Sequence, residues 1–331
     1  MPPRIEEGDG ASTGVSAGHR PAPVAWPDPV DEILAGDQAI AAAYVTPAGG
    51  VVLLPLTNPG LRDREAGRIT PYTSSIGMWR KLAKLQRNGR IAVAYHTRAH
   101  GFSRRPEYVL VQGRASLTPF DDRSWIERHR ESWERFYGPR DVGMWELLLR
   151  AYHWRIAAEM EVERMLVWPD LSCRGEPEVH GAARSDHARS QPPPANGSGP
   201  RTDHRRAARR ASRLPNVLLG WVGGDGFPVI VPVRVEGSEE RGILLAPPPG
   251  TVPPGGRRAG LLAHSFARYT FGQHQRKHTG WLEADGDRAV YAPHTEAGYR
   301  LPRSRFLFRA TAAFVTTRGL RQARREGFAP G

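Results

Sequence analysis

The residues with the clearest chemical potential lie in the stretch 73–97, which reads TSSIGMWRKLAKLQRNGRIAVAYHT. It opens with three hydroxyl residues, Thr73, Ser74 and Ser75. Apolar residues then recur at helical spacing, so the hydroxyls precede a helix N-terminus, where unpaired N–H groups favour an anion. Arg80 and Lys81 can lean back toward that end because helical side chains tilt toward the helix start. The stretch is therefore one candidate for a phosphate site.

The same residues also fit a purely structural role, in which Ser74 or Ser75 only caps the helix and the basic side chains face water. The use of lysine keeps the functional interpretation open. The chain has 47 lysine and arginine residues, yet only Lys81, Lys84 and Lys277 are lysines. Two of the three therefore lie in this one predicted helix.

The strongly basic composition is weaker evidence of function. The formal net charge is +13 and the sequence pI is near 10.6, values that are typical of nucleic-acid or anionic-surface binders. However, much of the charge lies in 172–213, which has nine arginines against four acidic residues, and in the C-terminal tail. We expect solvated segments there, so a nucleic-acid partner is not the favoured interpretation.

Several classes of protein and site are not expected. We expect residues 1–29 to form a disordered N-terminal tail. They lack the basic start and apolar core of a signal peptide or a membrane span, so we expect a cytoplasmic protein with no membrane partner. The single cysteine, Cys173, has no partner for a disulfide or a thiolate zinc site. His274 and His278 would share one face of a helix, but no third ligand is evident, so we expect no metal.

Apolar runs between turn residues predict a largely antiparallel β domain over 30–171, with a few peripheral helices. A short helix capped by Asp31 comes first. The expected strands are 39–45, 51–56, 69–73, 90–97, 107–118 and 155–168. Helices are expected at 76–87 and within 118–154. The fold class is therefore mainly β with peripheral helices.

The second half of the chain repeats this pattern. Residues 172–213, centred on QPPPANGSGP, have few apolar residues and predict a flexible linker. After it, VIVPVRV stands beside VLLPLTN of the first half, and the later strands recur in the same order. The repeat indicates a tandem duplication, with the second unit at 214–318 and a basic tail at 319–331.

The order of elements and the segment KLAKLQRNGRIAV resemble the pyridoxamine 5'-phosphate oxidase-like split β-barrels, which bind FMN or the deazaflavin F420. Lys81 falls on the lysine of the family motif and Arg90 on its arginine, whereas Lys84 replaces the usual asparagine. The resemblance implies two split barrels in tandem. It covers 30–170 well and 214–310 loosely.

The resemblance also implies a cofactor site and a class of reaction. The cofactor-binding residues would be Tyr72 and Thr73 beside the ring, Trp79 as an aromatic wall, and the hydroxyls and basic side chains at the phosphate. The basic side chains are Arg80, Lys81 and Lys84. The expected activity is hydride transfer between FMN or F420 and a small organic substrate, with no catalytic residue assigned. The alternatives are a non-catalytic cofactor-binding or sensing protein and an anionic-polymer binder that uses the Arg-rich linker.

The duplication predicts how the two units associate. Single-barrel relatives form dimers with the cofactor between barrels, so the two units of this chain would form an intramolecular pseudo-dimer. The second unit has PPPG where the first has its hydroxyl run, and it lacks both lysines of the first unit. We therefore expect one cofactor for each chain. Arg257 and Arg258 could serve a second site, contact the first cofactor across the interface, or face solvent.

Overall fold

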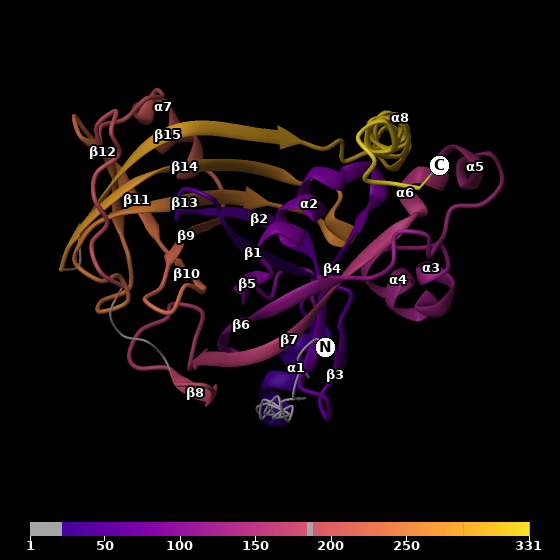
Figure 1. Ribbon diagram of the computed structural model, residues 1–331, viewed down its shortest axis with the longest axis horizontal. Coiled ribbons are helices and arrows are strands. Elements are labelled where there is room, and N and C mark those ends of the chain that lie inside the picture. Colours follow the sequence, from indigo (N-terminus) through magenta and orange to yellow (C-terminus); the bar gives the residue numbers. More distant parts are fainter. Residues whose placement is uncertain (1–21, 184–187, 287, 331) are drawn as a thin grey trace, which may run out of the picture.

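The computed structural model of the protein describes residues 22–183, 188–286 and 288–330, which form two β-sheets with helices at their edges (Figure 1). Most of the predicted N-terminal tail lies outside the described residues. The predicted fold class is confirmed, because both sheets are antiparallel throughout and the helices are peripheral. The first sheet has eight strands and the second has seven.

The first unit contains α1 to α6 and β1 to β8. Its helices are α1 (Asp28–Gly36), α2 (Trp79–Arg87), α3 (Trp125–Arg128), α4 (Arg130–Tyr137), α5 (Met144–Leu148) and α6 (Arg150–His153), with a 3-10 turn η1 (Ile76–Met78) before α2. Its strands are β1 (Ala39–Val45), β2 (Val51–Thr57), β3 (Leu61–Asp63), β4 (Arg68–Ser75), β5 (Arg90–Tyr95), β6 (Tyr108–Leu117), β7 (Arg155–Trp168) and β8 (Glu178–Gly181). The strand order is β2-β1-β5-β6-β7-β4-β3, with β8 paired to β7. Every strand expected for this unit is therefore present.

The second unit contains α7, α8 and β9 to β15. Its helices are α7 (His204–Ala211) and α8 (Arg305–Arg325), and a 3-10 turn η2 spans Arg268–Thr270. Its strands are β9 (Asn216–Val222), β10 (Pro228–Pro232), β11 (Arg234–Glu239), β12 (Gly242–Ala246), β13 (Gly255–Ser265), β14 (His274–Asp285) and β15 (Arg288–Arg300). The order β10-β9-β13-β14-β15-β12-β11 reproduces the first sheet strand for strand. The predicted tandem duplication is thus visible in the topology.

Two glycines mark the same irregularity in both sheets. The register shifts at Gly113 between β6 and β7, and at Gly280 between β14 and β15. A Cβ on Gly113 would lie 2.0 Å from the carbonyl oxygen of Glu161, and one on Gly280 would lie 2.1 Å from that of Ala292. Only glycine allows the neighbouring strand to approach so closely at these bulges.

The segment 172–213, predicted to be a flexible linker, contains the strand β8 and the helix α7. Strand β8 extends the first sheet, and α7 precedes β9 as α1 precedes β1, so the second unit begins with α7 and not at residue 214. Ala207, Ala208 and Ala211 of α7 are buried, and the first two belong to the second core. Alanine adds little to the hydrophobicity of an arginine-rich segment, so the sequence did not indicate that α7 would pack against the second sheet.

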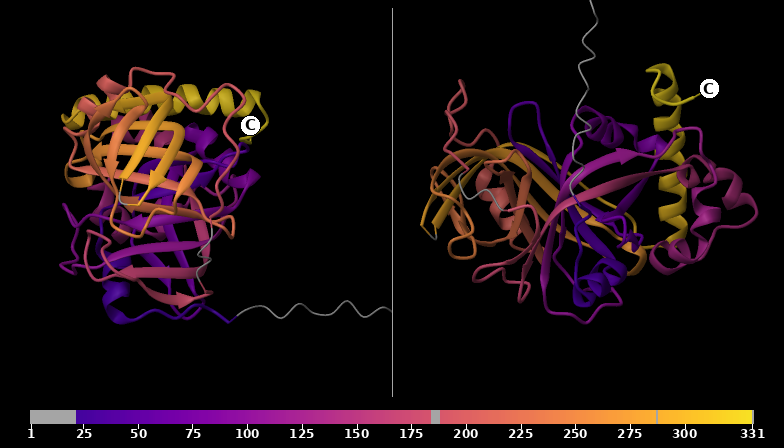
Figure 2. Two further views of the ribbon diagram at one scale, coloured as in Figure 1. Left: turned by 90° about the vertical axis from the view of Figure 1, so that its left-hand side faces the viewer. Right: turned by 60° about the horizontal axis from the view of Figure 1, so that its bottom comes forward.

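The C-terminal segment also differs from the prediction. Helix α8 continues past residue 319 to Arg325 and packs against η1, α2 and α6 of the first unit, so it is not a free tail (Figure 2). The short N-terminal helix differs in its cap, because α1 begins after Pro27 and Asp31 lies inside the helix.

No helix in the described part of the chain is both long and apolar enough to cross a bilayer.

The two units face each other across a pseudo-twofold axis. Strand β2 packs against β13 and β14, and the equivalent strand β10 packs against β5 and β6. The interface core includes Leu53 and Leu110 of the first unit together with Leu218 and Ile230 of the second. On the axis the imidazoles of the equivalent residues His96 and His264 meet, with their Nε2 atoms 2.9 Å apart. The structure thus has two units with contacts between equivalent strands, and the intramolecular pseudo-dimer of split barrels stays a prediction.

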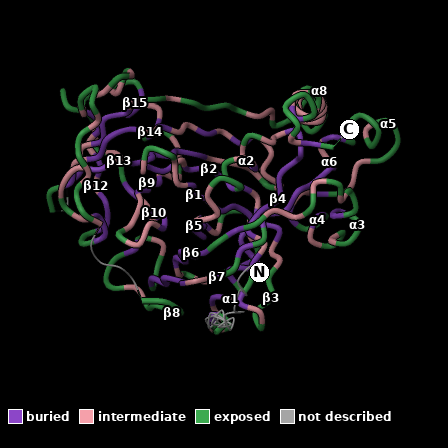
Figure 3. The backbone as a smooth tube through the Cα atoms, in the orientation of Figure 1, coloured by how far each residue is buried: buried purple, intermediate pink, exposed green. Residues whose placement is uncertain are grey.

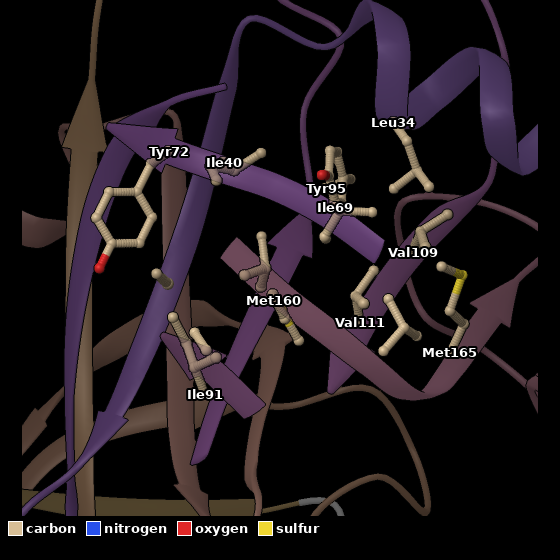
Figure 4. Close-up of a cluster of buried hydrophobic side chains, with 14 of the residues drawn as sticks. Leu34, Ile40, Ile69, Tyr72, Ile91, Tyr95, Val109, Val111, Met160 and Met165 are labelled. Atoms are coloured by element: carbon tan, nitrogen blue, oxygen red, sulfur yellow. The ribbon is translucent and has the colours of Figure 1, made fainter. Parts of the chain in front are cut away.

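Each unit also has its own core. In the first unit, residues from the sheet and from α1 converge on one apolar cluster, which includes Leu34, Ile40, Met160 and Met165 (Figure 4).

Strands β2 and β10 lie at equivalent ends of their sheets and carry the equivalent residues Pro55 and Pro232. A strand with one free edge tolerates proline because no ladder hydrogen bond is lost on that side.

The interface predicts that the units stay together without a continuous backbone. A protease recognition sequence inserted after Gly197 should be cleaved, because Gly197 has a positive φ and open space around it. The cleaved halves should co-elute in size-exclusion chromatography, since the shared core is large and apolar. Two separate, non-interacting halves would contradict the pseudo-dimer.

Candidate functional site

The predicted hydroxyl run lies at the end of β4, and its side chains have partners within the protein. Ser75 caps η1: its Oγ accepts a hydrogen bond from the Gly77 amide at 3.1 Å and donates one to the Ala151 carbonyl at 2.6 Å. The hydroxyl of Thr73 accepts a hydrogen bond from Nε of Arg155 at 3.0 Å. Both side chains are buried, as is Ser74. The capping role that the sequence left open is therefore the one seen for Ser75.

The helix start next to these hydroxyls is packed against protein. A Cβ on Gly77 would lie 2.3 Å from the Thr316 carbonyl oxygen of α8, and a Cβ on Gly319 would lie 1.9 Å from the Gly77 carbonyl oxygen. Helix α8 thus fits against η1 through two glycines. Because α8 covers η1, an anion would be bound by the basic side chains and not by the backbone N–H groups of η1.

The aromatic residues of the predicted site divide between core and surface. Tyr72 is fully buried, and its hydroxyl accepts a hydrogen bond from the hydroxyl of Tyr44 at 2.5 Å. Burial raises the pKa of Tyr72 well above its usual value. Trp79 is half-buried against Phe328, and the exposed Arg80 lies over its ring at 5.6 Å. None of these contacts reaches the lysines.

The three lysines of the chain form one basic cluster, although they come from both units. Lys81 and Lys84 lie on α2, and Lys277 lies on β14 of the second unit. Burial lowers the pKa of Lys81 to about 8, helped by the positive charges of Lys277, Arg155 and Lys84. The pKa of Lys277 is lowered by burial and by Lys84. Lys81 is therefore within electrostatic reach of the other three cations, and Lys277 is within reach of Lys84.

Arg155 forms the buried side of this basic cluster. Its guanidinium lies among three aromatic rings, with centroid distances of 5.2–5.4 Å, from Trp133, Tyr137 and Tyr152. It donates to Thr73, through both the hydroxyl and the carbonyl oxygen. Among the described residues, no carboxylate pairs with Arg155 or with any of the three lysines. Cations held together without an acid favour an anionic ligand, because their repulsion is relieved when one binds.

Sequence reasoning identified Lys81 and Lys84 but missed Lys277 and Arg155. Lys277 carried a usable signal, since it is the only other lysine in an arginine-rich chain. Arg155 carried none, because its place beside Thr73 depends on the pairing of β4 with β7.

Among its described residues, the second unit has no counterpart of this cluster. Strand β12 leads to β13 without a helix, and Arg257 is buried, donating to the carbonyls of Ala188, Pro253 and Pro254. Arg257 therefore holds its own loop together. Arg258 is half-buried, and its backbone amide donates to Gln191.

Other residues singled out in the sequence lie outside the basic cluster. His274 and His278 are on strand β14 and not on a helix. Cys173 is buried, and burial raises the pKa of its thiol well above the usual value. A hollow of about 380 Å³ lies between α3, α6 and α8, lined by Arg123, Arg150 and Trp154 among others, and no lysine lines it.

Comparisons with known proteins give only distant similarities. No protein-family model matches the chain, and no curated protein matches it. Solved structures of the pyridoxamine-phosphate oxidase and general stress protein 26 kind match about 45% of its length. A conserved hypothetical protein from Mycobacterium tuberculosis is 16% identical, over 45% of this chain and 88% of that one, with a TM-score of 0.34.

Two further solved structures show the same level of similarity. A protein from Clostridium acetobutylicum related to general stress protein 26, of the pyridoxinephosphate oxidase family, is 12% identical over 45% of this chain and 89% of that one, with a TM-score of 0.32. A putative pyridoxamine 5'-phosphate oxidase from Listeria innocua is 16% identical over 43% of this chain and 98% of that one, with a TM-score of 0.30. The chain is similar to these proteins in part of its fold.

Proposed function

We propose that the protein binds FMN or F420 through the basic cluster and transfers a hydride between that cofactor and a small organic substrate. The observation that carries the proposal is the meeting of Lys81, Lys84 and Lys277 with Arg155 in the absence of a paired acid in the described chain. A phosphate matches this donor set, because charge-assisted hydrogen bonds to it are strong and it neutralises the repulsion. The cytoplasmic location expected from the sequence remains a prediction.

The residues of the chain would bind and orient the cofactor. The flavin or deazaflavin supplies the hydride chemistry when it is bound. Lys81 and Lys84 would contact the phosphate from α2, and Lys277 would contact it from the second unit, so the site would be complete only when the two units are packed together. Arg155 would fix the end of β4 through Thr73. The sequence-predicted contacts of Thr73 and Trp79 with the ring are part of this proposal.

The absorbance spectrum of the purified protein tests the proposal directly. After incubation with excess FMN or F420 and removal of free cofactor, the protein should retain the visible absorbance of one of them. A bound cofactor that is reduced and reoxidised with substrates in turnover assays would support the enzyme. A bound cofactor without turnover on any reductant or acceptor would support a sensing protein instead.

The alternative of an anionic-polymer binder has less support. Arg206 and Arg210 of the Arg-rich segment face Glu296, with Arg210 hydrogen-bonded to it at 3.1 Å. Part of the positive charge of 201–213 is therefore used within the fold. Salt-dependent DNA retardation by a protein that binds neither cofactor would favour this alternative.

The lowered pKa of Lys81 predicts that cofactor binding weakens at alkaline pH. Lys81 is charged below about pH 8 and loses its proton above it, whereas a phosphate monoester is already doubly ionised above about pH 6. Affinity should therefore fall by up to roughly tenfold for each pH unit above 8. Dissociation constants at pH 7 and pH 9 measure this effect, and Lys81→Arg, which stays charged, should remove it. An equal pH dependence in both proteins would exclude Lys81 from the phosphate site.

A further inference from the structure

Large apolar side chains are exposed together on two helices. Most of the large hydrophobic residues with high exposure belong to α5, to α8 or to the position two residues before α5: Val142, Met144, Leu147, Leu148, Phe306, Leu307, Phe314 and Val315. Met144 and Phe314 are 68% and 67% exposed. No residue of α5 is buried, and its backbone is mostly exposed in Figure 3. A concentration of this kind marks an interaction surface.

The two helices form one continuous surface, here called the α5–α8 surface. The rings of Trp145 and Phe306 meet edge to face with centroids 5.4 Å apart. Arg309 lies over the ring of Trp145 at 5.5 Å, and Arg305 and Arg309 both face Asp141, which precedes α5. These contacts fix α5 beside the first half of α8. The exposed apolar side chains of α5 therefore lie next to the start of α8, which carries the exposed Phe306 and Leu307.

The second half of α8 continues this surface with positive charge. Helix α8 contains six arginines and no acidic residue. Its outward residues recur every three, four or seven positions and so share one face: Leu307, Phe314, Arg318, Arg321 and Arg325. The opposite face is packed against the first unit, where Thr316 and Ala323 are buried. The helix is thus held in place with one face apolar at its start and basic at its end.

We propose that the α5–α8 surface binds an anionic lipid bilayer. Apolar and aromatic side chains enter the boundary between headgroups and acyl chains, while arginines attract anionic headgroups. The positive charge of α8 favours an anionic bilayer over a second copy of the chain. A second copy of the chain would bring two arginine-rich α8 helices together, and α8 supplies no acid to pair with them.

This proposal revises two expectations from the sequence and is independent of the proposed cofactor site. The sequence predicted no membrane partner and a solvated tail at 319–331. In the structure that segment begins within an ordered helix whose exposed face is only partly polar. The protein would lie on the bilayer surface, since no described helix can cross it.

Vesicle co-sedimentation of the full-length protein tests the proposal. The protein should pellet with vesicles of three parts phosphatidylcholine to one part phosphatidylglycerol, and should remain in the supernatant with phosphatidylcholine alone. Added salt should reduce binding. Phe306→Ser with Phe314→Ser should lower the partition at least tenfold, and Arg318→Gln with Arg321→Gln should do the same.

Matched controls separate the surface from the overall charge. Arg205→Gln with Arg209→Gln removes two exposed arginines from α7, and Val179→Ser removes an exposed apolar side chain from β8. Both controls should change the partition less than twofold. Unchanged thermal unfolding of all variants would show that they are folded, as expected for exposed positions.

Three results would overturn the proposal. The first is no binding of the wild-type protein to anionic vesicles. The second is an equal loss of binding in the α7 control, which would mean that net charge alone causes it. The third is a dimer in sedimentation velocity that the phenylalanine substitutions abolish, which would assign the surface to a second copy.

Discussion

Replacing Lys81 and Lys84 together by alanine should weaken binding of FMN or F420 by roughly 2–5 kcal/mol, the sum expected for two charge-assisted contacts. Lys81 should account for the larger share, because it is half-buried whereas Lys84 is exposed and screened by solvent. Titration of the purified protein with cofactor, followed by absorbance or fluorescence, measures the change. The wild-type protein should bind one equivalent for each chain, since the second unit lacks α2 and its lysines.

The role of the second unit in the same site can be measured separately. Lys277→Ala should weaken binding without changing either residue of α2, because Lys277 approaches Lys81 and Lys84 from β14. Arg205→Gln with Arg209→Gln removes two charges elsewhere in the second unit and should leave affinity nearly unchanged. Two bound equivalents in the wild-type protein, or full affinity in the Lys81 and Lys84 variant, would show that the site is wrongly placed.

The protein should lose about 3 kcal/mol of stability between pH 6.5 and pH 4 because of His96 on the pseudo-twofold axis. Burial lowers the pKa of His96 to about 4, and burial together with His96 lowers the pKa of His264 well below its usual value. The unfolded chain therefore binds more protons than the folded protein below pH 6.5. The stability is complete above pH 6.5 and is lost as the pH falls toward 4.

Chemical denaturation from pH 7.5 to pH 4.5 measures this loss. The reference is the variant His96→Gln with His264→Gln, which retains polar side chains that do not titrate. The difference between the two proteins is needed because Asp37 acts in the opposite sense: burial raises its pKa to about 8, so its contribution falls as the pH rises from 4 to 8. Identical pH profiles for the two proteins would mean that the pair is not buried and neutral.

The sheets and their duplication could be predicted because their signals are local. Alternating apolar runs, the turn between β1 and β2, and the shared prolines at Pro55 and Pro232 are all visible in short segments. The strand order within each sheet repeats because the same local patterns recur. The helix α2 was also predictable, since Leu82 and Leu85 share its buried face.

The two helices whose roles were not predicted, α7 and α8, are positioned by contacts with segments that are distant in the sequence. Helix α7 is short and rich in arginine, and only its docking of Ala208 against the second core shows that it opens the second unit. Helix α8 has no clean apolar face, because one side packs on Gly77 of the first unit and the other remains exposed. Nothing in the local sequence indicates that α8 would pack against η1, at the start of α2.

For the proposed site, too, only the features with a local signal could be predicted from the sequence. The lysines of α2 were found from their rarity and from the resemblance, but the assignment of Tyr72 depended on the resemblance alone, and the structure places its side chain in the core. The hydroxyls were ambiguous in the sequence, because capping a helix and binding an anion need the same residue types at the same place. Only the partners of Ser75 distinguish these roles.

The fusion of the two units changes how the protein can vary. In a homodimer of identical chains every substitution occurs twice, once on each side of the axis. Here Tyr108 donates a hydrogen bond to the Ile230 carbonyl at 2.8 Å, while the second unit has Gln275 at the equivalent position. Each side of the interface can therefore mutate alone. One unit can therefore keep the residues of the proposed cofactor site, while the equivalent residues of the other unit change to support the interface.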